Sequence, residues 1–536
     1  MPEYLAPGVF VEEIELGAKS IEGVSTSTVG FVGKCERGPL KPKLIVNFSD
    51  YQRIYGGYLK DSFMTYQVDG FFKNGGKRCF VARIISKDAT HSTLDLDKSS
   101  GAGKSTAVKA IGPGGWGNRI VVDVSDATLN DDNLFKLKIK YFDEKIPSSV
   151  EDDTVASFEE VYDDLSSDPK SGSYYEKVVN GTSPLIALEL KNEGRPKNTE
   201  WKKLENGTDN GTESSTTTTG SGKKATTSTS TTPSEWNMSK DDFAGREVQV
   251  KDSNGDIVEV IKTGLLGFKQ LTEISIVVAP DENKVVGLTD EIISHCENLK
   301  DRFAIIQAPQ DAVTKVGTLF PPKDSKYAAY YMPWINIIDP LTNTGKLIPP
   351  GGHVSGIYAR SDVERGVHKA PANEVVRGVS ALQLNIDKGI QEVLNPKGIN
   401  VIRSFPGRGP TVWGARTVSR DPLWTYVNVR RLFIFLEKSI EQSTQWVVFE
   451  PNNERLWARV RATITNFLTS IWRSGALMGT TPDEAFFVRC DRSTMTQNDI
   501  DTGKLICIIG VAPTKPAEFV IFRLAQTKPG ATLEEF

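Results

Sequence analysis

Histidine and cysteine are scarce in this chain of 536 residues. It has four histidines, which are few for a metal site or for an enzyme that relies on acid–base catalysis. The five cysteines stand at positions 35, 79, 296, 490 and 507, and no Cys-x-x-Cys pair occurs among them. Scattered thiols of this kind are typical of a protein made in a reducing cytoplasm. We therefore expect no metal and no cofactor.

Long hydrophobic runs and an excess of one charge are also missing. No stretch approaches the roughly 20 apolar residues that a membrane-spanning helix needs, and the N-terminus has no basic, apolar signal region. The 64 basic and 68 acidic residues give a net charge of −4, which does not support nucleic acid as a partner. We expect neither membrane insertion nor nucleic-acid binding.

Residues 100–106, Ser-Gly-Ala-Gly-Lys-Ser-Thr, invite comparison with a phosphate-binding loop. That motif needs a glycine five residues before the glycine that precedes the lysine, and Lys98 occupies this position. Residues 106–111 alternate like a strand and lead through a glycine-rich turn to a second strand at 120–124. We expect a hairpin here and no nucleotide binding.

Catalytic side chains are present without a catalytic motif. Predicted strands and a predicted helix alternate at 274–280, 288–299, 302–306 and 327–335. This alternation indicates parallel strands with helical crossovers, an architecture that often holds an active site. Asp281, His353, Ser361 and Asp362 are the candidates, but the sequence lacks Gly-x-Ser-x-Gly and His-Glu-x-x-His motifs. The stretch 349–356, rich in Gly and Pro, is interpreted as a loop shaped for packing. We expect no catalytic residue.

The most regular pattern lies between residues 426 and 491. Apolar residues at helical spacing predict helices over 427–440 and 454–474, the second capped by an Asn and ended by Gly475. Short β-rich runs predict strands at 446–449 and 485–488.

The residues of this region resemble a known family. The runs YVNVRRLFIFLEKSIEQSTQWVVFEPN, LWARVRATITNFLTSIWRSGAL and PDEAFFVRCDRSTMTQNDIDTGKL are similar to the C-terminal domain of contractile-tail sheath proteins. Such sheaths occur in myophage tails, R-type bacteriocins and phage-tail-like injection particles. Further matches are YLAPGVFVEEI, GPGGWGNRI, GIYARSDVERGVHKAPANEVVRGV, LNPKGINVIRSF, WGARTVS and IGVAPTKPAEFVIFRL. Residues of about 125–265 do not match.

The resemblance and the pattern together imply a multidomain α/β protein with a discontinuous core. The expected parts are an N-terminal linking arm (1–20), a core α/β domain (21–90 and 265–365), an inserted outer β-rich domain (91–264), a C-terminal α/β polymerisation domain (366–514) and a C-terminal linking arm (515–536). A tract at 205–235, low in complexity, has too few apolar residues to form a core of its own.

Both termini carry strand-forming apolar residues. Residues 9–16 could be the first strand of the following domain or an arm that adds a strand to another subunit, and the resemblance favours the arm. The residues expected in the two arms are Val9, Phe10, Val11, Ile14 and Leu16, and Phe519, Val520, Ile521, Phe522 and Leu524. We expect strands donated by two other subunits to complete a small sheet, to which 446–449 and 505–509 contribute.

Arginines make the predicted helix at 454–474 basic. Arg455, Arg459 and Arg461 could form a solvated face, with their aliphatic stems lying on the core. The alternative, which rests on the resemblance, is that they face an acidic patch on an inner tube.

The resemblance implies a structural subunit of a contractile tail sheath, which polymerises helically around an inner tube and contracts to drive the tube through a target envelope. The alternatives are a non-contracting or cap- or baseplate-proximal variant and, as the least favoured, an enzyme that resembles an α/β hydrolase. Implied partners are further copies of the chain, the tube protein, and baseplate and cap or terminator proteins. Assembly in a bacterial cytoplasm is implied, followed by incorporation into a virion or a released or anchored particle.

Overall fold

The computed structural model describes residues 21–129, 131–210, 212–219, 226–233, 237–251 and 256–521, without side-chain detail in 212–219, 226–233 and 251. The chain divides into two compact units. The first comprises residues 22–367 and 371–442, and the second includes 368–370 and 443–521. Both contain helices and strands, so the predicted multidomain α/β class is confirmed.

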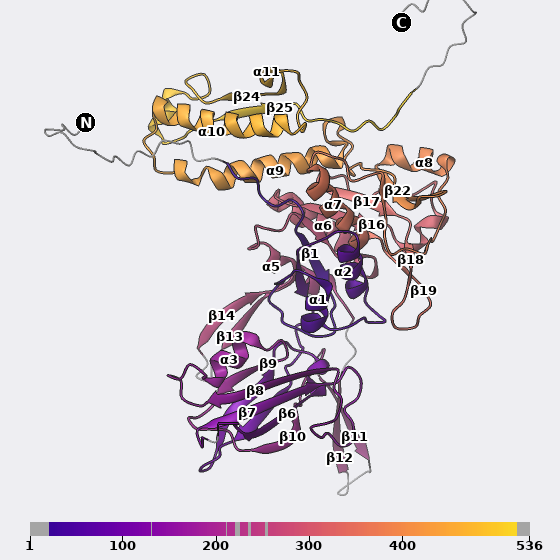
Figure 1. Cartoon of the computed structure of the whole chain (residues 1–536). Helices are drawn as coiled ribbons and strands as arrows, with labels where there is room; N and C mark the ends of the chain where they lie inside the picture. Colours follow the sequence, from indigo (N-terminus) through magenta and orange to yellow (C-terminus); the bar gives the residue numbers. More distant parts are fainter. Residues whose placement is uncertain are drawn as a thin grey trace, which may run out of the picture. The chain divides into compact units, whose positions relative to one another are not determined.

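A sheet of nine strands forms the centre of the first unit (Figure 1). In spatial order the strands are β2 (Lys43–Ile45), β3 (Cys79–Arg83), β1 (Val29–Gly33), β15 (Ile276–Val278), β16 (Phe303–Gln307), β17 (Ala328–Met332), β22 (Ile399–Phe405), β23 (Gly409–Val412) and β20 (Glu374–Val375). The run from β3 to β22 is parallel, and the edge strands are antiparallel. Strands β1, β3, β16 and β17 are buried throughout, as expected for short apolar runs in a covered parallel sheet.

The direct pairing of β1 with β15 explains how a long insertion fits into the core. Val29 lies opposite Ile276, so the chain leaves the sheet after β3 and returns to it beside β1. The strands predicted at 274–280, 302–306 and 327–335 are confirmed as β15, β16 and β17. The helix predicted at 288–299 is confirmed as α6 (Leu288–Leu299).

Two helices of the first unit, α2 (Met64–Lys73) and α7 (Gly351–Arg365), pack closely together beside this sheet. The loop predicted at 349–356 is therefore wrong, because residues 351–356 form the first turns of α7. Their glycines serve the close helix contact: a Cβ on Gly352 would lie 2.1 Å from the carbonyl oxygen of Gln67. The remaining helices and strands of the core are α1 (Phe48–Tyr55), α5 (Gly264–Phe268), α8 (Lys388–Leu394), α9 (Val427–Ser443), β18 (Ile335–Ile338), β19 (Gly345–Ile348) and β21 (Ala381–Leu382).

The inserted region contains two sheets that share one apolar core. One sheet has the order β10 (Thr199–Lys203), β6 (Ile120–Asp126), β7 (Leu134–Tyr141) and β8 (Phe158–Ser166), and the other β4 (Thr93–Asp97), β5 (Lys104–Ala110) and β9 (Ile186–Leu190). Helices α3 (Tyr175–Thr182) and α4 (Lys240–Ala244) and the paired strands β11 (Thr212–Thr219) with β12 (Thr226–Pro233) and β13 (Glu247–Lys251) with β14 (Ile257–Lys262) complete it. The hairpin predicted between 106–111 and 120–124 is wrong in its pairing, since β5 pairs with β4 and β9 while β6 lies in the other sheet.

The second unit contains α10 (Glu454–Arg473), α11 (Pro482–Ala485), β24 (Phe486–Arg489), α12 (Gln497–Asp501) and β25 (Ile508–Val511). Asn453 caps α10 by accepting a hydrogen bond from the backbone of Leu456, and Gly475 follows the helix with φ of 81°, as predicted. The strand predicted at 446–449 is wrong: a 3-10 turn covers Gln445–Val447, and Phe449 has φ of 67°. An apolar run forms a strand only where a partner strand is available. None of the described strands pairs with residues 446–449.

Candidate functional site

The second unit presents a sheet of only two strands. Strands β24 and β25 are antiparallel, with Phe486 opposite Val511 and Arg489 opposite Ile508. Helix α10 packs on β24 (Figure 1), and the side chain of Phe486 is buried. Within the described residues neither outer edge of this sheet carries a third strand. An isolated pair of strands is marginally stable, and its open edges offer unpaired backbone groups to another chain.

The chain leaves this sheet with an exposed apolar segment. Backbone hydrogen bonds from Met478 to Ala512 and from Thr514 to Ala476 hold it as far as residue 514. Beyond that point Phe519, Val520 and Ile521 belong to no helix or strand, and 73%, 67% and 77% of their surfaces are exposed. The other residues expected in the arms, namely Val9, Phe10, Val11, Ile14, Leu16, Phe522 and Leu524, lie outside the described residues.

Helix α10 exposes the three arginines that the sequence singled out. Arg455, Arg459 and Arg461 are all exposed, and the guanidinium of Arg459 lies 4.6 Å from the ring centre of Trp446. Arg461 lines a groove together with Trp457 and Cys490. The three side chains are thus accessible to a partner, and the tube-facing role remains a prediction.

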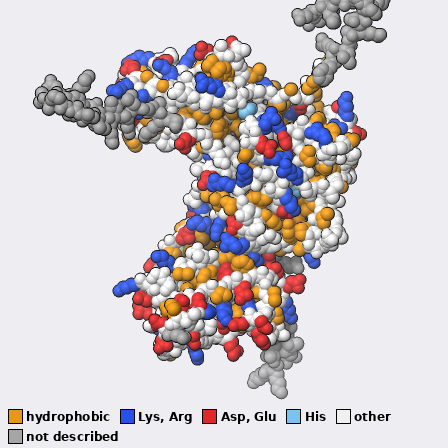
Figure 2. All heavy atoms as spheres, in the orientation of Figure 1, with side chains coloured by type: hydrophobic (Ala, Val, Ile, Leu, Met, Phe, Trp, Pro, Cys, Tyr) orange, Lys and Arg blue, Asp and Glu red, His pale blue; other side chains and the backbone are white. Residues whose placement is uncertain are grey.

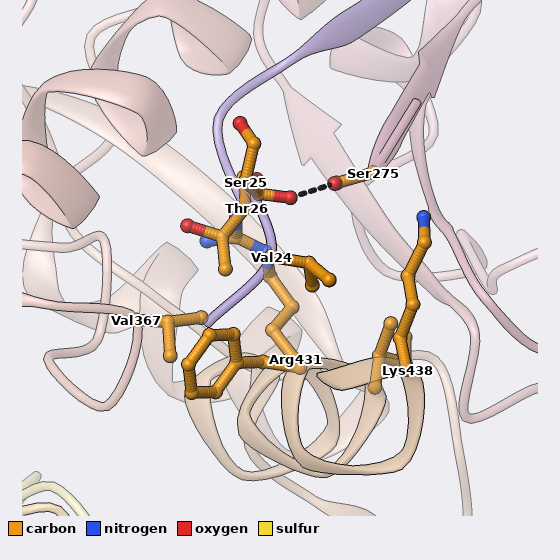
Figure 3. A pocket seen from close by; sticks show the side chains of 9 residues that line it. Val24, Ser25, Thr26, Ser275, Val367, Arg431 and Lys438 are labelled. Atoms are coloured by element: carbon orange, nitrogen blue, oxygen red, sulfur yellow. Dashed lines mark hydrogen bonds between the residues drawn. The ribbon is translucent and has the colours of Figure 1, made fainter. Parts of the chain in front are cut away.

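In the first unit, the segment that follows the N-terminal residues crosses helix α9 (Figure 3). The backbone amide of Val24 donates to Ser439 Oγ at 3.2 Å, and a guanidinium nitrogen of Arg431 donates to the carbonyl oxygen of Thr26 at 2.8 Å. Ser275 Oγ donates to the carbonyl oxygen of Ser25 at 2.6 Å. The segment is therefore bonded to both α9 and the start of β15.

Buried ion pairs hold α9 on the core. Arg431 donates to both carboxylate oxygens of Asp362 in α7, at 2.8 and 2.6 Å, and both side chains are almost fully buried. Lys438 Nζ lies 3.7 Å from a carboxylate oxygen of Asp301, and burial lowers the pKa of Lys438 in spite of that charge. Removing one member of a buried pair leaves the other charge uncompensated. These contacts make α9 a fixed part of the core.

The side chains considered for catalysis have separate structural roles. Asp281 accepts hydrogen bonds from Ser62 Oγ at 2.7 Å and from the backbone amide of Phe63 at 3.0 Å, while Asp362 pairs with Arg431. His353 is buried against α2, and burial lowers its pKa to about 3. The lysine of the 100–106 stretch, Lys104, pairs with Asp97 at 2.7 Å across the β4–β5 hairpin.

Metal-binding clusters and membrane-spanning helices are absent from the described ranges. No group of three or more His, Cys, Asp or Glu side chains there could hold a metal ion. No helix there is long and apolar enough to cross a membrane.

Two models of known protein domains match this chain. Residues 269–418 match the model of the phage tail sheath protein central domain, and residues 419–527 match that of the phage tail sheath C-terminal domain. Residues 269–527 belong to the phage tail sheath family. Both matches lie C-terminal to the residues of about 125–265 that the sequence resemblance leaves unmatched.

Curated relatives of the chain are tail sheath proteins. That of Vibrio phage KVP40 is 25% identical over 224 residues, which cover 41% of this chain and 31% of the relative. That of Enterobacteria phage T4 is 23% identical over 206 residues, which cover 37% of this chain and 30% of the relative. The chain thus spans about a third of the length of these curated relatives.

Solved structures resemble the fold over almost the whole chain. The sheath complex of the extracellular contractile injection system PVC, in its contracted state, has a TM-score of 0.54 at 21% identity and covers 98% of this chain and 99% of its own. The contracted helical sheath of the anti-feeding prophage has a TM-score of 0.55 at 23% identity, covering 98% and 100%. The sheath tail protein Lin1278 from Listeria innocua has a TM-score of 0.56 at 12% identity, covering 92% and 96%.

Proposed function

We propose that the chain is a structural subunit of a contractile tail sheath, which polymerises helically around an inner tube and contracts to drive that tube through a target envelope. The observation that carries the proposal is the two-stranded sheet β24–β25, which has open edges and an exposed apolar segment just beyond it. Membership of residues 269–527 in the sheath family and the fold shared with two contracted sheaths support it.

Strand exchange between subunits is the proposed linkage. Residues Phe519, Val520 and Ile521, with Phe522 and Leu524 beyond them, would pair with an open edge of β24–β25 in a neighbour. The N-terminal arm at 9–16 would do the same in another neighbour. Such pairing satisfies free backbone groups and buries the apolar side chains. A donated segment and its acceptor edge are different surfaces, and repeated contacts of this kind build open helical assemblies.

Contraction then requires no catalytic group, so the proposed subunit is not an enzyme. The extended assembly would be metastable, and each core would move as a rigid body while the arms keep neighbours connected. The buried ion pairs between α9 and the core support rigid movement of the first unit.

The proposal also includes contacts with the inner tube and with baseplate and cap proteins. Arg455, Arg459 and Arg461 would face an acidic patch on the tube, and baseplate and cap proteins would bind the ends of the sheath. A baseplate structure of the anti-feeding prophage, with a TM-score of 0.53 and 23% identity, is among the similar folds. We also propose that the sheath assembles in the bacterial cytoplasm. The chain would divide into two arms, a core, an insertion and a polymerisation domain.

A charge placed in the donated segment tests the linkage. Val520→Asp should leave the free subunit folded, because Val520 belongs to no helix or strand and 67% of its surface is exposed, but it should prevent polymerisation. Circular dichroism checks the fold, and sedimentation with negative-stain imaging checks for tubes. Val155→Asp, at a residue that is 91% exposed in the inserted region, is the matched control and should still assemble. Full-length sheath from the Val520 variant would refute the linkage.

A further inference from the structure

Two cysteines face each other at the end of the two-stranded sheet. The last described pair of the ladder is Arg489 with Ile508, and the next residues outward are Cys490 and Cys507. Both are free thiols, and each thiol shifts the pKa of the other, as expected of neighbouring side chains. In a chain with only five cysteines, the fold has brought together two that are 17 positions apart in sequence.

The ladder places this pair where a disulfide fits. The amide of Ala512 donates to the carbonyl oxygen of Ala485, its direct partner in the register, so this is a hydrogen-bonded pair. Hydrogen-bonded and non-hydrogen-bonded pairs alternate along an antiparallel ladder, which makes Cys490–Cys507 a non-hydrogen-bonded pair. The Cα atoms of such pairs lie about 4.5 Å apart, within the range of roughly 4.4–6.8 Å found for disulfides.

The surroundings give the two sulfurs different roles. Cys490 is buried, and it lines the groove that also contains Trp457 and Arg461. The neighbouring Cys507 thiol and the charge of Arg461 lower the pKa of the Cys490 thiol. Cys507 is partly exposed, and the Cys490 thiol raises its pKa. An external reagent thus reaches Cys507, and Cys490 is the better thiolate behind it.

We propose that Cys490 and Cys507 form a reversible disulfide that staples β24 to β25 when the protein meets oxidising surroundings. The oxidant is a small-molecule disulfide. The Cys507 thiolate attacks one of its sulfurs, which forms a mixed disulfide and releases one small thiolate. The Cys490 thiolate then attacks the Cys507 sulfur and expels the second small thiolate. The two protein thiol protons pass to the released thiolates, so the protein loses two hydrogens and the oxidant becomes two thiols.

The staple would act on an element that has little support of its own. It closes the loop at 491–506 and limits fraying of a sheet that consists of two strands. Thiols persist in a reducing cytoplasm and are oxidised outside it. Formation of the bond does not depend on the proposed sheath function. If that function is correct, the staple fixes the sheet to which neighbouring arms are proposed to pair.

Thiol mapping of the full chain tests the proposal. The purified protein is equilibrated in buffers of rising ratio of oxidised to reduced glutathione, free thiols are alkylated, and the peptides are analysed by mass spectrometry. We expect one linked peptide pair, Cys490 with Cys507, which disappears on reduction, while Cys35, Cys79 and Cys296 stay alkylatable after denaturation. Alkylation of both Cys490 and Cys507 at every ratio, or bonding of either one to another cysteine, would overturn the proposal.

A second readout reports the effect on the sheet. Amide hydrogen exchange in residues 486–490 and 507–511 should slow on oxidation of the wild-type chain and recover on reduction. In Cys507→Ser the same oxidant should change nothing in these residues, and Cys296→Ser should behave as the wild type. Unchanged exchange in a chain that carries the bond would show that it is not a staple. Because both readouts use the free chain, they can succeed even if the chain forms no sheath.

Discussion

Burial and hydrogen bonding act in opposite directions on the carboxyl group of Glu282. Its side chain is buried, and one carboxylate oxygen accepts hydrogen bonds from the backbone amide of Gln307 at 2.5 Å and from its side-chain amide at 3.0 Å. Burial prevails and raises the pKa of Glu282 to about 8 from its ordinary value of 4.5. At neutral pH the folded protein therefore holds a proton that the unfolded chain has lost.

This proton makes stability depend on pH. Between pH 4.5 and about 8 the folded state binds more protons than the unfolded state, so the free energy of unfolding falls as pH rises. In Glu282→Gln, which cannot ionise, that fall should be shallower by up to about 1.4 kcal/mol per pH unit. Denaturant unfolding at several pH values measures it, with Asp290→Asn, an exposed acid in α6, as control. Equal slopes in wild type and Glu282→Gln would contradict the account.

At the scale of single residues, the sequence indicated local backbone structure better than contacts between distant side chains. The sequence predicted a strand, and not a helix, after Lys104, and Lys104 does lie in the β4–β5 hairpin, where it pairs with Asp97. Neither the burial of Glu282 nor the pairing of Arg431 with Asp362 could be predicted, since both depend on residues far apart in the sequence.

At the scale of elements, Gly352 allows helices α7 and α2 to pack closely together. A Cβ added to Gly352 in α7 would collide with the backbone of α2, 2.1 Å from the carbonyl oxygen of Gln67. Gly352→Ala should therefore destabilise the protein by about 3 kcal/mol and lower its Tm in calorimetry. Gly181 in α3 has nothing within 4 Å of its added Cβ, so Gly181→Ala should leave Tm unchanged or raise it slightly. Equal effects of the two substitutions would show that the helix contact is not tight.

The structure shows that the low-complexity tract begins later than residue 205. Residues 205–210, which the predicted tract included, are bonded to the inserted sheets: Thr208 pairs with Thr90, and Glu205 with Thr93. Strands β11 and β12 pair only with each other among the described strands. Acidic side chains gather over the inserted sheets on the face in Figure 2, which suits a surface exposed to water. We propose that this region lies on the outside of the sheath.

Replacing residues 212–233 with a short Gly-Ser linker should therefore leave assembly intact, because no described strand outside β11–β12 pairs with them. Starting the replacement at residue 205 should lower the Tm of the inserted region, since it removes the hydrogen bonds between Thr208 and Thr90. Negative-stain imaging and calorimetry of the two variants check both outcomes. Loss of sheath formation in the shorter replacement would mean that the tract is structural.

Prediction from sequence worked best for elements whose apolar residues are all buried in their own chain. Helix α6 has the bounds that its pattern indicates, because its apolar residues from Leu288 to Cys296 are buried in the core. The run at 446–449 failed because no described strand lies beside it, and the run at 349–356 failed because its glycines belong to a helix contact. Local pattern identifies residues that must be covered, but it does not say what covers them.

At the scale of the whole molecule, the C-terminal segment and the sheet β24–β25 are two surfaces that their own chain leaves uncovered. Phe519, Val520 and Ile521 are apolar and exposed, and the ladder of β24 and β25 is open. We propose that another copy of the chain covers each of these surfaces. The C-terminal segment and the open sheet are therefore the two halves of one proposed contact.

A cryo-EM map of the assembled sheath tests this contact most directly. We predict that residues 519–524 form a strand hydrogen-bonded to an edge of β24 or β25 in another subunit, so that the two-stranded sheet becomes larger only in the assembly. A map in which these residues pair with the sheet of their own subunit, or in which the sheet keeps two strands, would contradict the account.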